Sequence, residues 1–277
     1  MRRTAVSLAF DTGAEQLELA YDVRGHGPTL ILLHGLVHRR HAWDPVAERL
    51  ARHRRVVTVD LPGHGDSPEL PEDADVLEGS IERLARFVRA VTPPGEKPHL
   101  AGNSLGGYLA LELACRGMAE SVTALSPAGF ALGALDHRRS VAMFTALRTA
   151  VRLMTADRVS AALVRAPLRA ILLAAFYARG WKADPVTAAI DVRSLLDNAV
   201  IDRATSAPVP RFTDPATVDC PITIAWGRRD LILPVYQVRQ ARKLFPQATM
   251  LTLPGLGHVP MPDDPALIGA VLLAGSS

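Results

Sequence analysis

Short, continuous runs of apolar residues recur along this chain and constrain its fold more than any other feature. Thr29–Leu33, Val122–Leu125 and Ile222–Trp226 are long enough for a strand and carry no polar alternation. A continuous apolar run of this kind is typical of a strand whose two faces are both buried. Val76–Val91 lies between two such runs and has apolar residues at spacings of three and four, which is typical of an amphipathic helix. Strands that alternate with helices predict a mainly parallel sheet, covered on both faces.

This alternation stops after Ser126 and resumes at Pro221. Between Phe130 and Arg211 the sequence shows only helical periodicity. We therefore expect an α/β core formed by residues 1–128 and 212–277, with an all-helical cap inserted as residues 129–211. The core is expected to hold an eight-stranded, mostly parallel sheet. Its predicted strands are Val6–Phe10, Leu17–Val23, Thr29–Leu33, Arg55–Asp60, His99–Ala101, Val122–Leu125, Ile222–Trp226 and Thr249–Leu253.

Composition and charge exclude several classes of protein. The net charge is only +3, and no basic stripe with interleaved aromatic residues occurs, so nucleic-acid binding is not expected. The apolar stretch Val159–Tyr177 carries two arginines and a proline near its centre, which argues against a membrane span. Ala5–Phe10 is too short for the core of a signal peptide. Cys115 and Cys220 form neither a disulfide framework nor a zinc motif. We expect a soluble, cytoplasmic protein, as a monomer or a homodimer.

A sharp turn is predicted at Gly102-Asn103-Ser104-Leu105-Gly106, between the strand His99–Ala101 and a helix over Tyr108–Arg116. A serine on such a strand-to-helix turn stands clear of the sheet, beside the unpaired N–H groups of the helix. The turn requires small neighbours, and glycines stand on both sides. An ordinary glycine-rich turn with a capping serine is the alternative. The context favours Ser104 as a nucleophile.

A serine hydroxyl needs an adjacent base. His258 is the only histidine beyond the last predicted strand, and it lies in a loop rich in glycine and proline. Asp230 directly follows Ile222–Trp226 and is placed to orient the imidazole, so the order Ser, Asp, His results. A salt bridge or a simple turn is the alternative role for Asp230, and Asp136 is the second choice for the acid.

Acyl transfer also needs N–H donors that face the developing oxyanion. We assign the two donors to the backbone N–H groups of Leu105, next to the nucleophile, and of Leu36, in the loop after Thr29–Leu33. Gly35 allows a close approach there. His34 is interpreted as a structural histidine that holds this loop.

Together these segments resemble the α/β-hydrolase superfamily with a helical cap. The resemblance covers essentially the whole chain except the insertion. The segments that carry it are His34-Gly35, Asp60–Ser67, Gly102–Gly107, Trp226–Asp230 and Gly257-His258. It implies a serine hydrolase, because related epoxide hydrolases and haloalkane dehalogenases have an aspartate where Ser104 stands.

We therefore predict a carboxylesterase-like enzyme that cleaves a small to medium apolar ester through an acyl-enzyme, with no metal or organic cofactor. One alternative is a carbon–carbon hydrolase acting on a ring-fission diketone, since Gly102-Asn103-Ser104 also resembles the turn of those enzymes. Another is a ligand-binding protein of the same fold with little turnover. The candidate pocket residues are Phe130, Met143, Phe144, Phe176, Tyr177 and Trp181, although for most of them we favour a place in the core of the cap, since aromatic residues at helical spacing usually pack internally.

Overall fold

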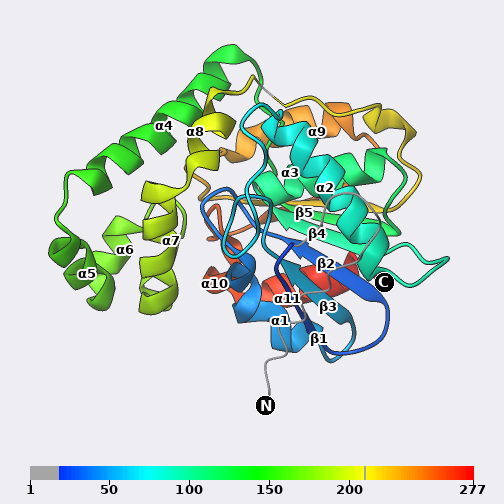
Figure 1. Cartoon of the computed structure of the whole chain (residues 1–277), viewed down its shortest axis with the longest axis horizontal. Coiled ribbons are helices and arrows are strands. Elements are labelled where there is room, and N and C mark those ends of the chain that lie inside the picture. The colour runs from blue at the N-terminus through cyan, green and yellow to red at the C-terminus, as the bar shows by residue number, and fades with distance from the viewer. Residues whose placement is uncertain (1–18, 209) are drawn as a thin grey trace.

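The strands form one twisted sheet in the computed structural model, which describes residues 19–208 and 210–277 (Figure 1). Within these residues the sheet has seven strands in the order β1-β3-β2-β4-β5-β6-β7. All neighbours are parallel except β1 and β3. Seven of the eight predicted strands are therefore confirmed, and the eighth, Val6–Phe10, lies outside the described residues. The strands are β1 (Tyr21–Arg24), β2 (Thr29–Leu33), β3 (Arg55–Val59), β4 (His99–Asn103), β5 (Ser121–Leu125), β6 (Ile222–Gly227) and β7 (Thr249–Leu253).

Strands β2, β4 and β5 are buried at every residue, which explains why their sequences show no polar alternation. The register brings the carboxyl ends of neighbouring strands to the same edge. Leu33 at the end of β2 pairs with Gly102, and Asn103 at the end of β4 pairs with Leu125. Ligands bind at this edge in open α/β sheets.

Helices cover both faces of the sheet (Figure 1). One apolar cluster includes residues of α2 (Val76–Val91), α3 (Leu105–Cys115) and α9 (Val238–Leu244). The other includes residues of α1 (Asp44–Leu50) and α11 (Pro265–Ala274). The predicted bounds of Val76–Val91 are those observed, because Asp75 caps the helix by accepting hydrogen bonds from two backbone N–H groups. Shorter elements are η1 (Arg40–Trp43), η2 (Gly180–Lys182), η3 (Pro215–Thr217), η4 (Val235–Gln237) and α10 (Pro260–Asp263).

Between β5 and β6 the described residues form helices and no strand. Most of these helices stand to one side of the sheet, at the left in Figure 1. We call this segment, residues 129–211, the helical insertion. It packs on the rest of the chain through α8 against α2 and through η2 against α10. Its longer helices are α4 (Ala134–Arg152), α5 (Ala156–Val164), α6 (Ala166–Leu172), α7 (Pro185–Asp197) and α8 (Ala199–Ser206).

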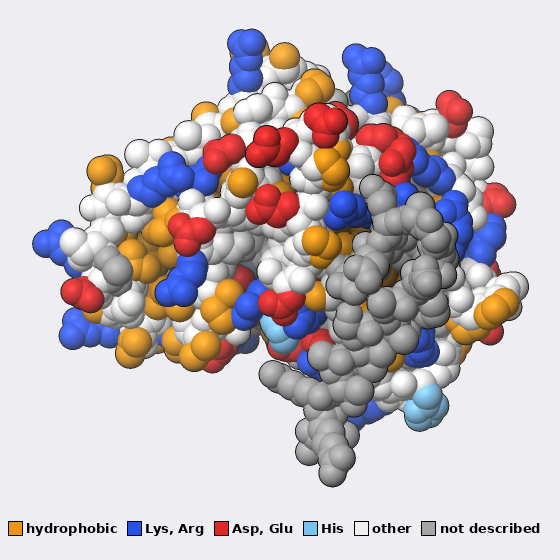
Figure 2. Space-filling view, in the orientation of Figure 1, with side chains coloured by type: hydrophobic (Ala, Val, Ile, Leu, Met, Phe, Trp, Pro, Cys, Tyr) orange, Lys and Arg blue, Asp and Glu red, His pale blue; other side chains and the backbone are white. Residues whose placement is uncertain are grey.

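The insertion exposes many large hydrophobic side chains. Figure 2 shows hydrophobic groups on the surface of this part, with basic and acidic side chains interspersed over the visible face. Among residues 19–208 and 210–277, no helix combines the length and the hydropathy needed to cross a bilayer. The exposed large hydrophobic residues of the insertion are Leu132, Leu135, Met143, Leu153, Val164, Leu168, Ile171, Trp181 and Val186.

Candidate active site

Ser104 lies on the sharp turn between β4 and α3, in a strained conformation with φ 56° and ψ −117°. Residues with a Cβ rarely adopt a positive φ, and such strain clusters at functional sites. The flanking glycines are sterically required. A Cβ at Gly102 would lie 2.1 Å from the carbonyl oxygen of Gly106, and a Cβ at Gly106 would lie 2.1 Å from that of Leu33. The turn therefore requires glycine at positions 102 and 106, two residues before and two after Ser104.

His258 and Asp230 form a buried pair. Nδ1 of His258 lies 2.8 Å from Oδ2 of Asp230. The other oxygen, Oδ1, accepts hydrogen bonds from the backbone N–H groups of Ile232 (2.9 Å) and Leu233 (2.8 Å). The Asp230 side chain is fully buried, so these bonds fix the carboxylate in place. A carboxylate that accepts from Nδ1 leaves Nε2 of the imidazole available as a base.

Asn103 ties the loop that carries His258 to the sheet. Its side-chain NH₂ group donates to the carbonyl oxygens of His258 (2.9 Å) and Leu125 (3.0 Å). The asparagine is fully buried, next to Ser104 in the chain. Sequence reasoning did not assign it this role, because a hydrogen bond over 155 positions leaves no local pattern.

The helical insertion also holds the His258 loop. Asp263 accepts hydrogen bonds from the backbone N–H groups of Gly257 (2.8 Å), Ala178 (3.0 Å) and Arg179 (2.6 Å). Gly257 must be small here, because a Cβ would lie 2.6 Å from the nitrogen of Ala178. These contacts join the loop after β7 to the segment between α6 and η2. Sequence reasoning missed Asp263, since nothing near it in the chain indicates these partners.

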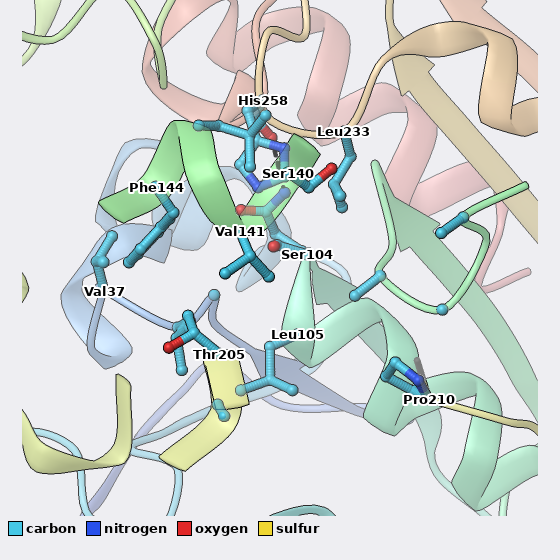
Figure 3. Close-up of a pocket in the computed structure, with 18 of the residues that line it drawn as sticks. Val37, Ser104, Leu105, Ser140, Val141, Phe144, Thr205, Pro210, Leu233 and His258 are labelled. Atoms are coloured by element: carbon cyan, nitrogen blue, oxygen red, sulfur yellow. Dashed lines mark hydrogen bonds between the residues drawn. The ribbon is translucent and has the colours of Figure 1, made fainter. Parts of the chain in front are cut away.

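Ser104 and His258 line one cavity of about 140 Å³ (Figure 3). Its walls come from the loop after β2, from α2, from the residues after Asp230 and from the insertion. Most lining side chains are apolar. They include Leu36, Val37, Leu77, Leu105, Val141, Phe144, Phe176, Ile232 and Leu233.

The six predicted pocket residues divide between several environments. Phe144 and Phe176 line the cavity. Phe130 is fully buried in the core, where its ring packs against three other aromatic rings. Met143 and Trp181 lie on the surface of the insertion, with 38% and 51% of their area exposed. These differences arise because helical periodicity gives the buried face of a helix but not the neighbour that covers it.

The sixth of these residues, Tyr177, belongs to a buried polar cluster behind the cavity. Its hydroxyl lies 3.1 Å from Nε2 of His38 and donates to Oδ2 of Asp191 over 3.4 Å. Burial lowers the pKa of His38 to about 3, and the nearby His258 contributes. Burial also raises the pKa of Asp191 to about 7, against the opposing effect of Arg39. The cluster joins the loop after β2 to α7 of the insertion.

Leu36 and Leu105, the predicted oxyanion donors, both line the cavity. Within the part of the chain that the structure describes, neither backbone N–H donates to another protein group. The loop of Leu36 is held by His34, whose Nε2 accepts from the N–H of Leu61 (3.0 Å) while Nδ1 donates to Gly35 O (2.8 Å). Burial holds the pKa of His34 well below its ordinary value. The N–H groups of Leu36 and Leu105 thus belong to residues of the cavity wall and have no acceptor among the described residues.

The described residues offer no group of side chains suited to bind a metal ion. Among residues 19–208 and 210–277, no three His, Cys, Asp or Glu side chains gather as a metal ion would require.

A known protein family shares the sequence pattern of this chain. A family model described as "Alpha/beta hydrolase family" matches residues 30–271, which is most of the chain. This chain belongs to the alpha/beta hydrolase family. The sequence-based resemblance and the expected α/β fold are thus confirmed.

Relatives of this hydrolase include esterases. It is 33% identical to a pimeloyl-[acyl-carrier protein] methyl ester esterase of Xanthomonas oryzae pv. oryzae, over 86% of this chain and 91% of the relative. A thermophilic esterase from Thermogutta terrifontis has a similar structure, with a TM-score of 0.69 and 22% identity, over 99% of this chain and 97% of that one. A meta-cleavage product hydrolase matches with a TM-score of 0.70 and 18% identity, over 93% of each chain. Identities this low show the shared fold alone, and the esterase character of this hydrolase is supported by its sequence relatives.

Proposed function

We propose that this hydrolase is a serine esterase in which Ser104 is the nucleophile, His258 the general base and Asp230 the residue that orients the base. The observation that carries the proposal is the 2.8 Å contact of His258 with Asp230, at the cavity where Ser104 stands on a strained turn. A fixed acid–base pair beside a strained serine is the arrangement that acyl transfer requires.

Acylation begins when Oγ of Ser104 attacks the ester carbonyl carbon and Nε2 of His258 takes the hydroxyl proton. The carbonyl π electrons move to oxygen, and the N–H groups of Leu36 and Leu105 stabilise the resulting oxyanion. Asp230 stabilises the imidazolium. The oxyanion then re-forms the carbonyl, the bond to the alkoxy oxygen breaks, and His258 gives its proton to the departing alcohol.

Deacylation repeats these steps with water as the nucleophile. His258 takes a proton from water as the water oxygen attacks the acyl carbon. The tetrahedral intermediate collapses, the bond to Oγ of Ser104 breaks, and the serine regains its proton from His258. The products are one acid and one alcohol, and every proton that His258 accepts is returned.

The substrate that fits best is a small to medium apolar ester. The lining is mostly hydrophobic, and about 140 Å³ of space holds a short chain or a small ring. The Xanthomonas relative is named as a methyl ester esterase, so methyl esters of medium-length acids belong in the first substrate panel. We further propose that Phe144 and Phe176 contact the substrate, that residues 129–211 act as a cap, and that the enzyme works in the cytoplasm as a monomer or homodimer.

The test uses Ser104→Ala and a panel of short acyl esters. We expect a loss of about 10⁴-fold or more in kcat with unchanged folding, because the substitution is small and removes the nucleophile. A fluorophosphonate probe should label the wild type and not the variant. Ser160→Ala, a change at an exposed serine of α5, is the matched control and should behave as the wild type.

Three outcomes would count against the proposal. A Ser104→Ala variant that keeps more than a few per cent of the rate would remove Ser104 from the mechanism. Cleavage of a vinylogous diketone but not of esters would favour the carbon–carbon hydrolase. Absence of both turnover and probe labelling in the wild type would favour a ligand-binding protein.

A further inference from the structure

Three of the described residues that line the cavity, Asn103, Ser140 and Gln237, have a buried side-chain oxygen without a hydrogen-bond partner. Oε1 of Gln237 and Oγ of Ser140 have no hydrogen-bond partner among the described residues. Gln237 is fully buried and Ser140 is 9% exposed. Both side chains line the cavity that contains Ser104 and His258 (Figure 3 labels Ser140). Buried polar groups are nearly always hydrogen-bonded, so the unpartnered oxygens of Gln237 and Ser140 indicate a partner that the protein itself does not supply.

Gln237 is held so that its oxygen remains free. Its NH₂ group donates to Oδ2 of Asp136 over 3.0 Å. A carboxylate can only accept, so this contact fixes which end of the amide is nitrogen. Asp136 is itself anchored by the hydroxyl of Tyr236 (2.5 Å) and the N–H of Leu132 (3.0 Å). Oε1 is therefore a fixed acceptor that requires a donor.

Ser140, on α4, has different hydrogen-bonding properties, because its hydroxyl can both donate and accept. Other polar groups in the same wall are satisfied within the protein. Oγ1 of Thr205 donates to the carbonyl oxygen of Ile201 over 2.7 Å, and Nε2 of His137 lies 3.3 Å from Ala207 O. Among the described residues that line the cavity, the only other buried side-chain atom without a partner is Oδ1 of Asn103, on the turn of the nucleophile, whereas Gln237 lies on η4 and Ser140 on α4.

We propose that Gln237 and Ser140 form a polar subsite that binds a hydroxyl group of the ester substrate. This inference rests on the proposed function and names the substrate class more closely. A hydroxyl can donate to Oε1 of Gln237 and accept from the Ser140 hydroxyl, so one neutral group can satisfy both of these side chains. A carboxylate is excluded, because it cannot donate and would face both Oε1 and the carboxylate of Asp136.

The experiment compares plain esters with hydroxylated ones. Methyl esters of medium-length acids are prepared unsubstituted and with one hydroxyl at successive carbons, together with hydroxyalkyl esters of one plain acid. We measure kcat/KM for each with the wild type, and Kd with Ser104→Ala, which binds without turnover. At least one hydroxylated ester should be preferred over its plain counterpart by about tenfold in both readouts, the size of one good hydrogen bond.

Variants then assign the preference to the subsite. Gln237→Leu and Ser140→Ala should each reduce the ratio of hydroxylated to plain ester toward one. Thr205→Val is the matched control, since it removes a hydroxyl from the same cavity that is already paired, and its ratio should equal that of the wild type. If the preference for the hydroxylated ester disappears in either subsite variant, the inference is supported, even if the other variant does not fold.

The results that would overturn the inference are separate from those against the proposed function. Turnover of esters with no hydroxylated compound preferred overturns the subsite and leaves the esterase standing. A preference that survives in both subsite variants, or disappears in Thr205→Val as well, also overturns it. Absence of ester turnover, with tighter binding of a hydroxylated ester that depends on Gln237 or Ser140, overturns the esterase and supports the subsite.

Discussion

At Asn103 a single side chain connects the turn of the nucleophile to the loop of the base. The asparagine lies beside Ser104 and donates to the carbonyl oxygen of His258 over 2.9 Å. It touches no reacting atom in the proposed mechanism, so it is a positioning residue. Shifts of about 1 Å in a catalytic group can lower a rate 100-fold. The effect of Asn103 should thus appear in the chemical step more than in substrate binding.

We predict that Asn103→Ala lowers kcat by about 10- to 100-fold and changes KM much less, because it loosens the backbone of His258 without altering the cavity's apolar walls. Steady-state kinetics on a short acyl ester measure both constants. Asn198→Ala is the control, since Asn198 caps α8 and is not among the residues that line the cavity. A loss confined to KM would mean that Asn103 contacts the substrate instead.

Asp191 gives a prediction about pH and stability. Its pKa in the folded chain is about 7, above the ordinary value of 3.8. The folded state therefore holds the proton more tightly than the unfolded state. Its contribution to stability is complete below about pH 4 and is lost as the pH rises through about 7. Asp191→Asn carries no such proton.

The free energy of unfolding of the wild type, relative to Asp191→Asn, should consequently fall between about pH 4 and pH 7, by at most about 4 kcal/mol, and level off above that range. Urea unfolding of both proteins at several pH values measures this difference, and other titrating groups largely cancel. A difference that stays constant, or that grows with pH, would show that Asp191 is charged in the folded protein throughout this range.

At the scale of secondary-structure elements, contacts with the helical insertion hold the loop between β7 and α10 in place. The Asp263 carboxylate accepts hydrogen bonds from three backbone N–H groups, and two of these belong to residues 178 and 179 of the insertion. The N–H of Val259 also donates to Phe176 O over 2.9 Å. The insertion therefore does more than line the cavity, since its backbone also holds the loop that bears His258.

We predict that Asp263→Ala destabilises the protein by about 1–3 kcal/mol, the cost of leaving buried N–H groups unpaired, and lowers Tm by several degrees. It should also lower kcat, because the His258 loop loses its anchor. Calorimetry and ester kinetics measure the two effects. Asp73→Asn, at an exposed turn, is the control and should change neither. An unchanged Tm in Asp263→Ala would contradict this role.

Element bounds were predictable where local chemistry decides them. Val76–Val91 was found to the residue, since its cap and its apolar spacing are both encoded nearby. The buried strands were found because a short apolar run such as Thr29–Leu33 is too brief for a buried helix and fits a strand covered on both faces. Inside the insertion only the helical class was predictable. Packing between helices decides which faces of α4 and α7 are turned to the core. Hydrophobic periodicity gives the buried face of a helix but does not specify the helix or strand that covers it.

For the whole molecule, the candidate site could be predicted where the fold imposes its position. Ser104, Asp230 and His258 follow three strands whose carboxyl ends share one edge, so strand order alone brings them together. The cavity wall could not be predicted in the same way. Met143 and Trp181 lie outside it, while Leu77, Ser140 and Gln237 line it, because the wall is built from separate elements whose contacts are tertiary.

The central claim is that one serine, one base and two backbone N–H groups face a single point at the edge of the sheet. The most direct test is a crystal structure of the wild type after reaction with an alkyl fluorophosphonate. We predict phosphorus bonded to Oγ of Ser104, the phosphoryl oxygen within hydrogen-bond distance of the N–H groups of Leu36 and Leu105, and Nε2 of His258 beside the adduct. Phosphorus on another residue, or a phosphoryl oxygen turned away from both N–H groups, would contradict the account.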